Sequence, residues 1–318
     1  MEVRKVNGFF IIFVIGYIGL SVVCASIMAY AQNSGIAVPD WIQYVMSEGI
    51  ILLIAIIYMI VQKIDPIREI PYKRIGIVDV ILSLVAGYCL IPAVLLISNL
   101  SMLFSTNYLE EGTTTLLTYP FAMQVILLAV IPPLVEELIF RGIFFGSYRK
   151  AGMTGAALMS GLLFGCFHLN INQALYAFVM GIVFAYMVEA TGSLWSSVIA
   201  HFAVNTYSIG IVQILKMAGI YAQDGSVSET FENAESVAGQ STAITVVQIA
   251  MIAVIAAVFM MLAVLCIRTM AKRHGNLEKM KMQNVKLSHI KNYFTAPVIV
   301  GIVVCVMYMI MLEFSGTL

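Results

Sequence analysis

The chain has 318 residues, of which 61% are apolar and 11% are charged. A soluble domain is closer to half apolar and a quarter charged, and surface-to-volume scaling does not let a larger core absorb the difference. The mean hydropathy of +0.97 agrees, and 17 basic against 17 acidic residues leave no net charge to attract a polyanion. The composition therefore indicates a polytopic membrane protein and excludes soluble, fibrous, disulfide-stapled and nucleic-acid-binding classes.

Apolar runs follow one another along the whole chain. They lie at residues 9–30, 42–62, 77–104, 119–148, 153–169, 172–190, 194–216, 242–267 and 296–314. Lipid cannot satisfy exposed backbone groups, so such runs must be helical, and a span takes about 20 residues. We predict an all-α, polytopic bundle of transmembrane helices with eight or nine spans.

The basic residues gather on one side of an alternating nine-span chain. Fifteen of the 17 precede the first run or follow the second, fourth and eighth: Arg4, Lys5, Lys63, Arg68, Lys73, Arg74, Arg149, Lys150, Arg268, Lys272, Arg273, Lys279, Lys281, Lys286 and Lys291. The opposite loops carry Asp40, Glu110, Glu111, Asp224, Glu229, Glu232 and Glu235, with Lys216 as their nearby cation. By the positive-inside rule, this pattern predicts a multi-pass protein of the cell membrane with its N-terminus in the cytoplasm and its C-terminus outside.

The first run also resembles a secretory signal, because Ala29-Tyr30-Ala31 is similar to a cleavage site. Its apolar stretch is longer than the roughly 7–15 residues of a signal core, so we expect an uncleaved anchor; removal of residues 1–31 is the alternative. The acidic loop 217–241 and the basic segment 268–295 are the sizeable water-facing pieces. We interpret both as solvated loops, with a partner surface as the alternative.

Ionisable residues stand inside the fourth run, in the sequence Ile131-Pro132-Pro133-Leu134-Val135-Glu136-Glu137-Leu138-Ile139-Phe140-Arg141-Gly142. Such groups are costly within a span and are functional candidates by default. The two prolines interrupt a helix and then suit the first turn of a new one, where the helix dipole favours the glutamates. Glu137 and Arg141 are four residues apart and can pair on one face. Glu136 points about 100° away from Glu137 and needs another partner.

Polar side chains that can meet Glu136 occur in later runs. His168 ends the sequence Phe164-Gly165-Cys166-Phe167-His168, and His201 and Asn205 share one helical face. At 1.5 Å per residue from the cytoplasmic end of each helix, Glu136 lies about 18 Å up, His168 about 22 Å, Asn205 about 17 Å and His201 about 10 Å. Four polar groups from three helices therefore share a layer near the middle of the membrane, and we predict that they form one site.

The other polar or reactive groups within the runs have plainer interpretations. Glu48, Asp79 and Glu189 lie near span ends, where side chains can reach the membrane interface. The five cysteines lie within apolar runs and form no C-x-x-C pair, so we interpret them as small apolar residues in helices.

The chemistry that suits this set is hydrolysis of an acyl bond by activated water. A carboxylate beside a histidine can deprotonate water, and a second histidine with an amide can donate to the developing oxyanion. No Ser or Cys lies in a recognisable nucleophile motif, and Cys166, two residues from His168, need not share its face; covalent catalysis is the weaker alternative. Glu136, His168 and His201 could also bind zinc, but no H-E-x-x-H spacing is present. The spacing alone leaves the metal question open.

Together these residues resemble the CPBP family of intramembrane proteases, which includes type II CAAX prenyl endopeptidases and bacterial members similar to lysostaphin resistance protein A and the Abi proteins. The family motif EExxxR matches residues 136–141, FxxxH matches 164–168 and HxxxN matches 201–205. Residues Thr191-Gly192-Ser193-Leu194-Trp195 are similar to the TGSLW stretch of bacterial members. The order and approximate spacing agree, over roughly residues 119–210.

The resemblance implies a role for each matching residue. Glu136 and His168 would activate the attacking water, His201 and Asn205 would stabilise the oxyanion, and the Glu137–Arg141 pair would support the site. Both a metal-dependent and a metal-free glutamate mechanism have been argued for the family. We favour the metal-free one, because an asparagine is a poor zinc ligand and a good oxyanion donor.

These observations divide the chain into three parts. N-terminal transmembrane helices occupy residues 1–118, a CPBP-like catalytic core occupies 119–216, and an acidic loop with C-terminal helices occupies 217–318. We expect an intramembrane endopeptidase that cleaves a peptide or a membrane-protein substrate within the bilayer. The alternative is a non-proteolytic immunity factor or scaffold that keeps the motif for folding, and a proton-relaying transporter comes third.

Overall fold

The computed structural model describes residues 3–105, 118–218, 242–280 and 292–315, and within them the chain is helical with no β-strand. The all-α prediction is confirmed. In chain order the elements are α1 (Val3–Asn33), α2 (Trp41–Val61), α3 (Pro66–Glu69), α4 (Ile77–Ser101), α6 (Phe121–Gln124), η2 (Val125–Val130), α7 (Ile131–Glu137), η3 (Leu138–Phe145), α8 (Gly146–Tyr148), η4 (Arg149–Ala151), α9 (Met153–Phe167), α10 (Ile171–Thr191), α11 (Trp195–Met217), α13 (Thr242–Arg273), η5 (Leu277–Met280) and α15 (Ala296–Ser315).

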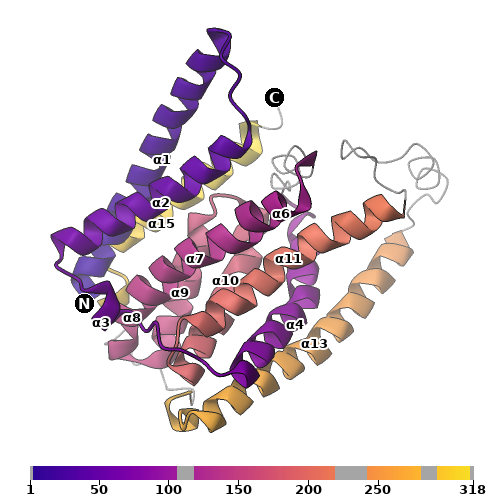
Figure 1. The fold of residues 1–318 in the computed structure, drawn as a ribbon. Coiled ribbons are helices and arrows are strands. Elements are labelled where there is room, and N and C mark those ends of the chain that lie inside the picture. Colours follow the sequence, from indigo (N-terminus) through magenta and orange to yellow (C-terminus); the bar gives the residue numbers. More distant parts are fainter. Residues whose placement is uncertain (1–2, 106–117, 219–241, 281–291, 316–318) are drawn as a thin grey trace.

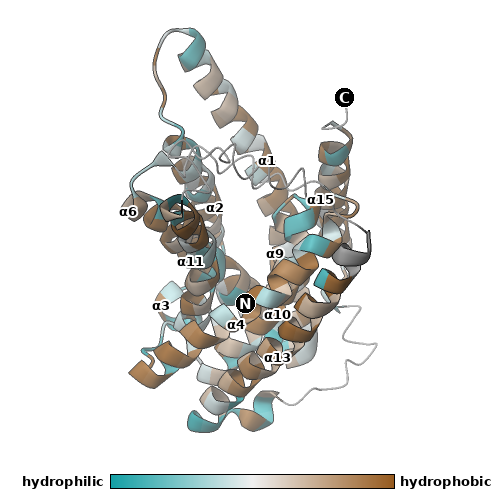
Figure 2. Cartoon of the chain, turned by 90° about the vertical axis from the view of Figure 1, so that its right-hand side faces the viewer, coloured by the Kyte–Doolittle hydropathy of each residue, from teal (hydrophilic) through white to brown (hydrophobic). Residues whose placement is uncertain are grey.

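Eight helices in the described ranges are long and apolar enough to cross a membrane. They are α1, α2, α4, the continuous run Phe121–Ala151, α10, α11, α13 and α15. The remaining apolar run, the fifth in chain order, forms α9, whose 15 residues rise about 22 Å against a hydrocarbon core of about 30 Å. Figure 2 shows helix bodies dominated by hydrophobic residues, with hydrophilic residues at helix ends. The chain is thus a multi-pass membrane protein, and its described part contains eight long apolar helices and one short one.

The helices pack into two groups that share a centre (Figure 1). One apolar core joins α1, α2 and α15 to the α7–α8 stretch, α9, α10 and α11, through side chains such as Phe13, Phe140 and Phe164. A second core joins α4 and α13 to α10 and α11. Because α10 and α11 contribute to both cores, the residues they carry lie at the centre of the bundle.

Close approach of α9 to α10 depends on glycine. A Cβ atom at Gly161 would lie 2.7 Å from the carbonyl oxygen of Phe178, and one at Gly165 would lie 2.5 Å from that of Ala174. These distances are too short for any side chain, so the two backbones are in contact, as small residues allow in membrane helix pairs. The contact fixes Phe164, which lies between the two glycines.

The TGSLW stretch forms the turn from α10 to α11. Gly192 takes a left-handed φ of +67°, which a glycine adopts without strain. The Ser193 hydroxyl donates to the carbonyl of Lys73, and the Leu194 amide donates to the carbonyl of Pro71 at 2.8 Å. The turn is therefore tied to the loop before α4, and this tie sets where α11 begins.

Two of the acidic residues assigned to span ends are engaged in ion pairs. Asp79 is buried and lies 3.2 Å from Arg273 Nε and 3.0 Å from His274 Nε2, so it joins α4 to the end of α13. Glu189 lies 3.5 Å from Arg149 Nη1. The interpretation that these side chains reach the interface is wrong for Asp79, because a buried carboxylate between two basic groups is held by them.

Figure 1 places the N-terminus, α3 and α8 at the same end of the bundle. This is the end to which the basic loops were assigned, although the direction in which it faces stays a prediction. Several residues of the charge argument lie outside the described residues: Glu110, Glu111, Asp224, Glu229, Glu232, Glu235, Lys281, Lys286 and Lys291.

Candidate active site

The fourth span stays helical through its two prolines by changing its hydrogen-bonding pattern. Pro132 and Pro133 start the α-helical segment α7, as expected, but π-helical segments precede and follow it, so the helix is not broken. Wider π turns are frequent at functional sites. Here they place Glu136 and Glu137 at the end of α7, with the side chain of Glu137 fully buried and that of Glu136 partly exposed.

Glu137 lies in a fully buried cluster of charges. Its Oε1 atom is 3.0 Å from Arg141 Nη1 and 3.2 Å from His201 Nδ1, and the side chains of Glu137 and Arg141 have no exposed surface. Because Nδ1 of His201 faces a carboxylate, the ring donates from Nδ1 and presents Nε2 on its other side. Glu137 therefore fixes both the charge of Arg141 and the orientation of His201.

Aromatic rings enclose the guanidinium of Arg141. Its Cζ atom lies 4.3 Å from the ring centroid of Phe164 and 5.2 Å from that of Phe184. Cation–π contacts of this kind are strongest where water is excluded. A methyl group at Gly181 would come within 3.3 Å of Arg141 Nη2, so α10 leaves just enough space for the guanidinium.

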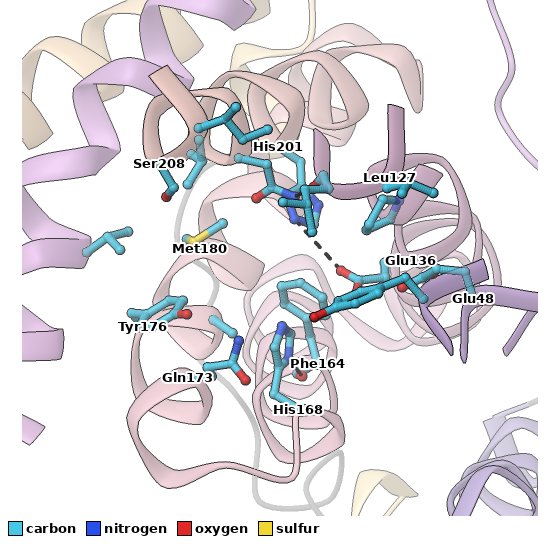
Figure 3. A pocket seen from close by; sticks show the side chains of 18 of the residues that line it. Glu48, Leu127, Glu136, Phe164, His168, Gln173, Tyr176, Met180, His201 and Ser208 are labelled. Carbon is cyan, nitrogen blue, oxygen red and sulfur yellow. Dashed lines mark hydrogen bonds and ion pairs between the residues drawn. The ribbon is translucent and has the colours of Figure 1, made fainter. Parts of the chain in front are cut away.

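Glu136 faces the opposite way, into a cavity of about 350 Å³ between α2, α7, α9, α10 and α11 (Figure 3). Its Oε2 atom is 3.8 Å from His201 Nε2, and its side chain is 14% exposed, whereas that of Glu137 is fully covered. His201 therefore lies between the two glutamates, with one ring nitrogen toward each.

His168 enters the same cavity from the end of α9. Its Nδ1 atom is 2.8 Å from the carbonyl oxygen of Phe164, one turn earlier in the FxxxH motif. A carbonyl can only accept, so Nδ1 donates and Nε2 keeps its lone pair. The Phe164 ring meets the edges of both histidines, at centroid distances of 4.7 Å to His168 and 5.8 Å to His201. Phe164 thus spaces the two imidazoles.

Asn205 also lines the cavity, and its amide nitrogen donates to the carbonyl oxygen of Leu128 at 2.9 Å. That carbonyl lacks its usual partner, because the residues four and five positions later are Pro132 and Pro133, which have no N–H. One of the two amide hydrogens of Asn205 is therefore engaged with the fourth span, and the side chain joins α11 to η2.

The structure thus brings Glu136, His168, His201 and Asn205 to one cavity. The Glu137–Arg141 pair is formed and lies behind the cavity wall. Among the residues described, no group of three or more His, Cys, Asp or Glu side chains is arranged to hold a metal ion. The zinc set Glu136, His168 and His201 shares the cavity but does not form such a group.

One residue of the cavity was missed by the sequence analysis. Glu48 lies on α2, eight residues into that helix, and lines the cavity beside Glu136 (Figure 3). Its interpretation as an interfacial side chain is wrong, because its Oε2 atom is buried. The signal in the sequence was a single acidic residue within a long apolar run, which by itself does not tell which face of the helix meets a neighbour.

Comparison with known proteins points to the same part of the chain. Residues 118–207 match the family described as type II CAAX prenyl endopeptidase Rce1-like. A stretch of 88 residues is 33% identical to "Putative membrane peptidase YdiL" of Bacillus subtilis (strain 168), and it covers 27% of this chain and 36% of that protein. The chain thus matches about a third of the length of this curated relative. No solved structure is significantly similar. The resemblance that the three motifs predicted is confirmed over this segment.

Proposed function

We propose that this chain, which carries a CPBP-type segment at residues 118–207, is an intramembrane endopeptidase that hydrolyses a peptide bond with water. The observation that carries the proposal is the cavity that Glu136, His168 and His201 line together, with Glu136 Oε2 3.8 Å from His201 Nε2. An ionisable set of this kind inside a membrane bundle is costly and indicates function. A purely structural motif would not require a carboxylate facing open space.

In the proposed reaction, Glu136 acts as the general base. Its carboxylate takes a proton from a water molecule, and the water oxygen attacks the carbonyl carbon of the scissile bond. The Nε2 lone pair of His168 accepts a hydrogen bond from the other O–H of that water, which stays on the attacking oxygen, and orients the water for attack. Glu136 then passes its proton to the leaving nitrogen, so that the products are a carboxylic acid and an amine.

The oxyanion of the tetrahedral intermediate needs donors on the other side of the cavity. Protonated His201 would supply Nε2–H, with Glu137 stabilising the imidazolium through Nδ1. Asn205 would supply the amide hydrogen that Leu128 does not take. Arg141 holds Glu137 in place and does not touch the substrate.

The substrate in this proposal is a peptide or a membrane protein that reaches the cavity within the bilayer. The proposed reaction uses no metal, because Glu136 supplies the base and His201 with Asn205 supply the donors. Measurement of bound metal in purified active protein, followed by assay of a metal-free sample, tests this part. Loss of activity on metal removal and recovery with zinc would contradict it.

The decisive variant is Glu136→Gln, which keeps the shape of the side chain and removes the base. Comparing the membrane proteomes of cells that express the wild-type chain or this variant should reveal cleavage products that depend on Glu136, with activity reduced by about 100-fold or more. Glu189→Gln is the matched control, since it removes a carboxylate at the far end of α10. Unchanged products in a normally expressed Glu136→Gln protein would favour an immunity or scaffold role.

A further inference from the structure

Glu48 is a second carboxylate in the cavity, and it comes from outside the family-matched segment. It lies on α2, which packs against α7, and Figure 3 shows it next to Glu136. The preceding residue, Ser47, is bound to the hydroxyl of Tyr17 on α1 at 2.9 Å. The hydrogen bond fixes the rotation of α2, so Glu48 is held toward the cavity.

In the described part of the chain, no Lys or Arg lines the cavity that the carboxylate of Glu48 faces. Its Oε2 atom is buried and has no hydrogen-bond partner among the described residues. The described cavity lining contains two glutamates and two histidines but no Lys or Arg. Arg141, on the fourth span, is occupied by Glu137 and by two aromatic rings.

Glu137 and Glu48 therefore differ in whether the fold places a cation beside the carboxylate, which decides the free-energy cost of burying it. A buried carboxylate is tolerated when a cation or several donors accompany it, and it is unfavourable otherwise. Glu137 has its cation within the fold, whereas Glu48 faces space that a ligand can enter. Apart from the two glutamates and the two histidines, the cavity wall is apolar or neutral, with Leu127, Met180 and Tyr176 among its side chains.

We propose that Glu48 binds a cationic side chain of the substrate, a lysine or an arginine, close to the scissile bond. The inference rests on the proposed protease function, since the cation belongs to the chain that is cleaved. Glu48 is then a specificity residue, and Glu136 remains the base.

The position of Glu48 limits where the cation lies. Glu48 and Glu136 line the same cavity and lie next to each other (Figure 3). The recognised cation is therefore on a residue close to the bond that Glu136 attacks. An acidic side chain at the same place would meet two carboxylates and would be rejected.

Binding can be measured apart from catalysis in the full-length chain carrying Glu136→Gln. The probes are apolar peptides that are identical except at one position, where each has Lys, Gln or Glu, with that position moved along the peptide in turn. At one or two adjacent positions, the Lys peptide should bind at least about 10-fold more tightly than the Glu peptide. Adding Glu48→Gln should remove the difference, Glu48→Asp should keep part of it, and Glu48→Lys should reverse it.

Glu189→Gln in the same background is the matched control and should leave the preference unchanged. Equal affinity for Lys and Glu peptides at every position, or no binding of either, overturns the inference. Cleavage assays with the wild-type chain test the cation-binding role of Glu48 separately from the proposed protease function. Cleavage without a preference for Lys refutes the role of Glu48 alone, whereas selective binding through Glu48 without any cleavage refutes the protease and leaves the cation site standing.

Discussion

The two sides of the fourth span use the same residue type in opposite ways. On one side Glu137 lies 3.0 Å from Arg141 and 3.2 Å from His201, with no exposed surface. On the other side Glu136 faces a cavity and has His201 at 3.8 Å. Both glutamates thus contact His201, but Glu137 also pairs with the cation Arg141, whereas Glu136 faces the cavity. The paired side stabilises the fold, and the unpaired side is free to act on a ligand.

The largest effect on stability is expected from breaking the paired side. Arg141→Met leaves Glu137 buried without its cation, which should lower the free energy of unfolding by about 3–5 kcal/mol. The double variant Glu137→Gln/Arg141→Met removes both charges and should recover most of the loss. The free energy of unfolding of each purified variant, measured in mild detergent, tests both expectations. Equal stability of wild type and Arg141→Met would show that the pair does not stabilise the fold.

A smaller effect is expected where Asn205 joins α11 to the fourth span. Asn205→Ala leaves the Leu128 carbonyl without a partner, which should cost about 1–3 kcal/mol. Pro132→Ala restores an N–H four residues after Leu128 and should return part of this loss in the double variant. If Pro132→Ala gives the same change with and without Asn205, the two sites are independent and the account of the Leu128 carbonyl is wrong.

The smallest effect on stability is expected on the unpaired side. Glu136→Gln and Glu48→Gln each remove a carboxylate that has no Lys or Arg partner among the described residues, so the free energy of unfolding in detergent should be unchanged or slightly higher. Glu136→Gln should nevertheless abolish cleavage. If either glutamine variant lowers the free energy of unfolding as much as Arg141→Met does, the two sides of the fourth span do not differ in their contribution to stability.

The helices could be predicted from the sequence because apolar runs in a membrane leave the backbone no alternative to helix. The local pairing of Glu137 with Arg141 was equally accessible, since residues four apart on a helix are neighbours. The grouping of His168, His201 and Asn205 near Glu136 followed from their depth along helices of known rise. Each of these inferences depends on distances along one helix axis.

The features that sequence could not reach depend on rotation about that axis and on contacts between distant helices. Glu48 lies in a run so uniformly apolar that no face is distinguished, and its orientation follows from the contact of Ser47 with Tyr17. The two prolines signal that the Leu128 carbonyl needs a donor, but Asn205 is 77 positions away. Asp79 was misread for the same reason, since its partner Arg273 belongs to α13.

The short helix α9 has a consequence for how the protein enters its membrane. With a rise of about 22 Å, α9 cannot cross the bilayer as an independent segment, and Gly161 and Gly165 bring it into backbone contact with α10. The turn between α9 and α10 contains Leu169, which has a left-handed φ of +55°. It also contains Asn170, whose side chain accepts a hydrogen bond from the backbone amide of Gln173 at the start of α10. We therefore expect α9 and α10 to insert during synthesis as one preformed hairpin, so that His168 reaches its depth only after α10 has been made.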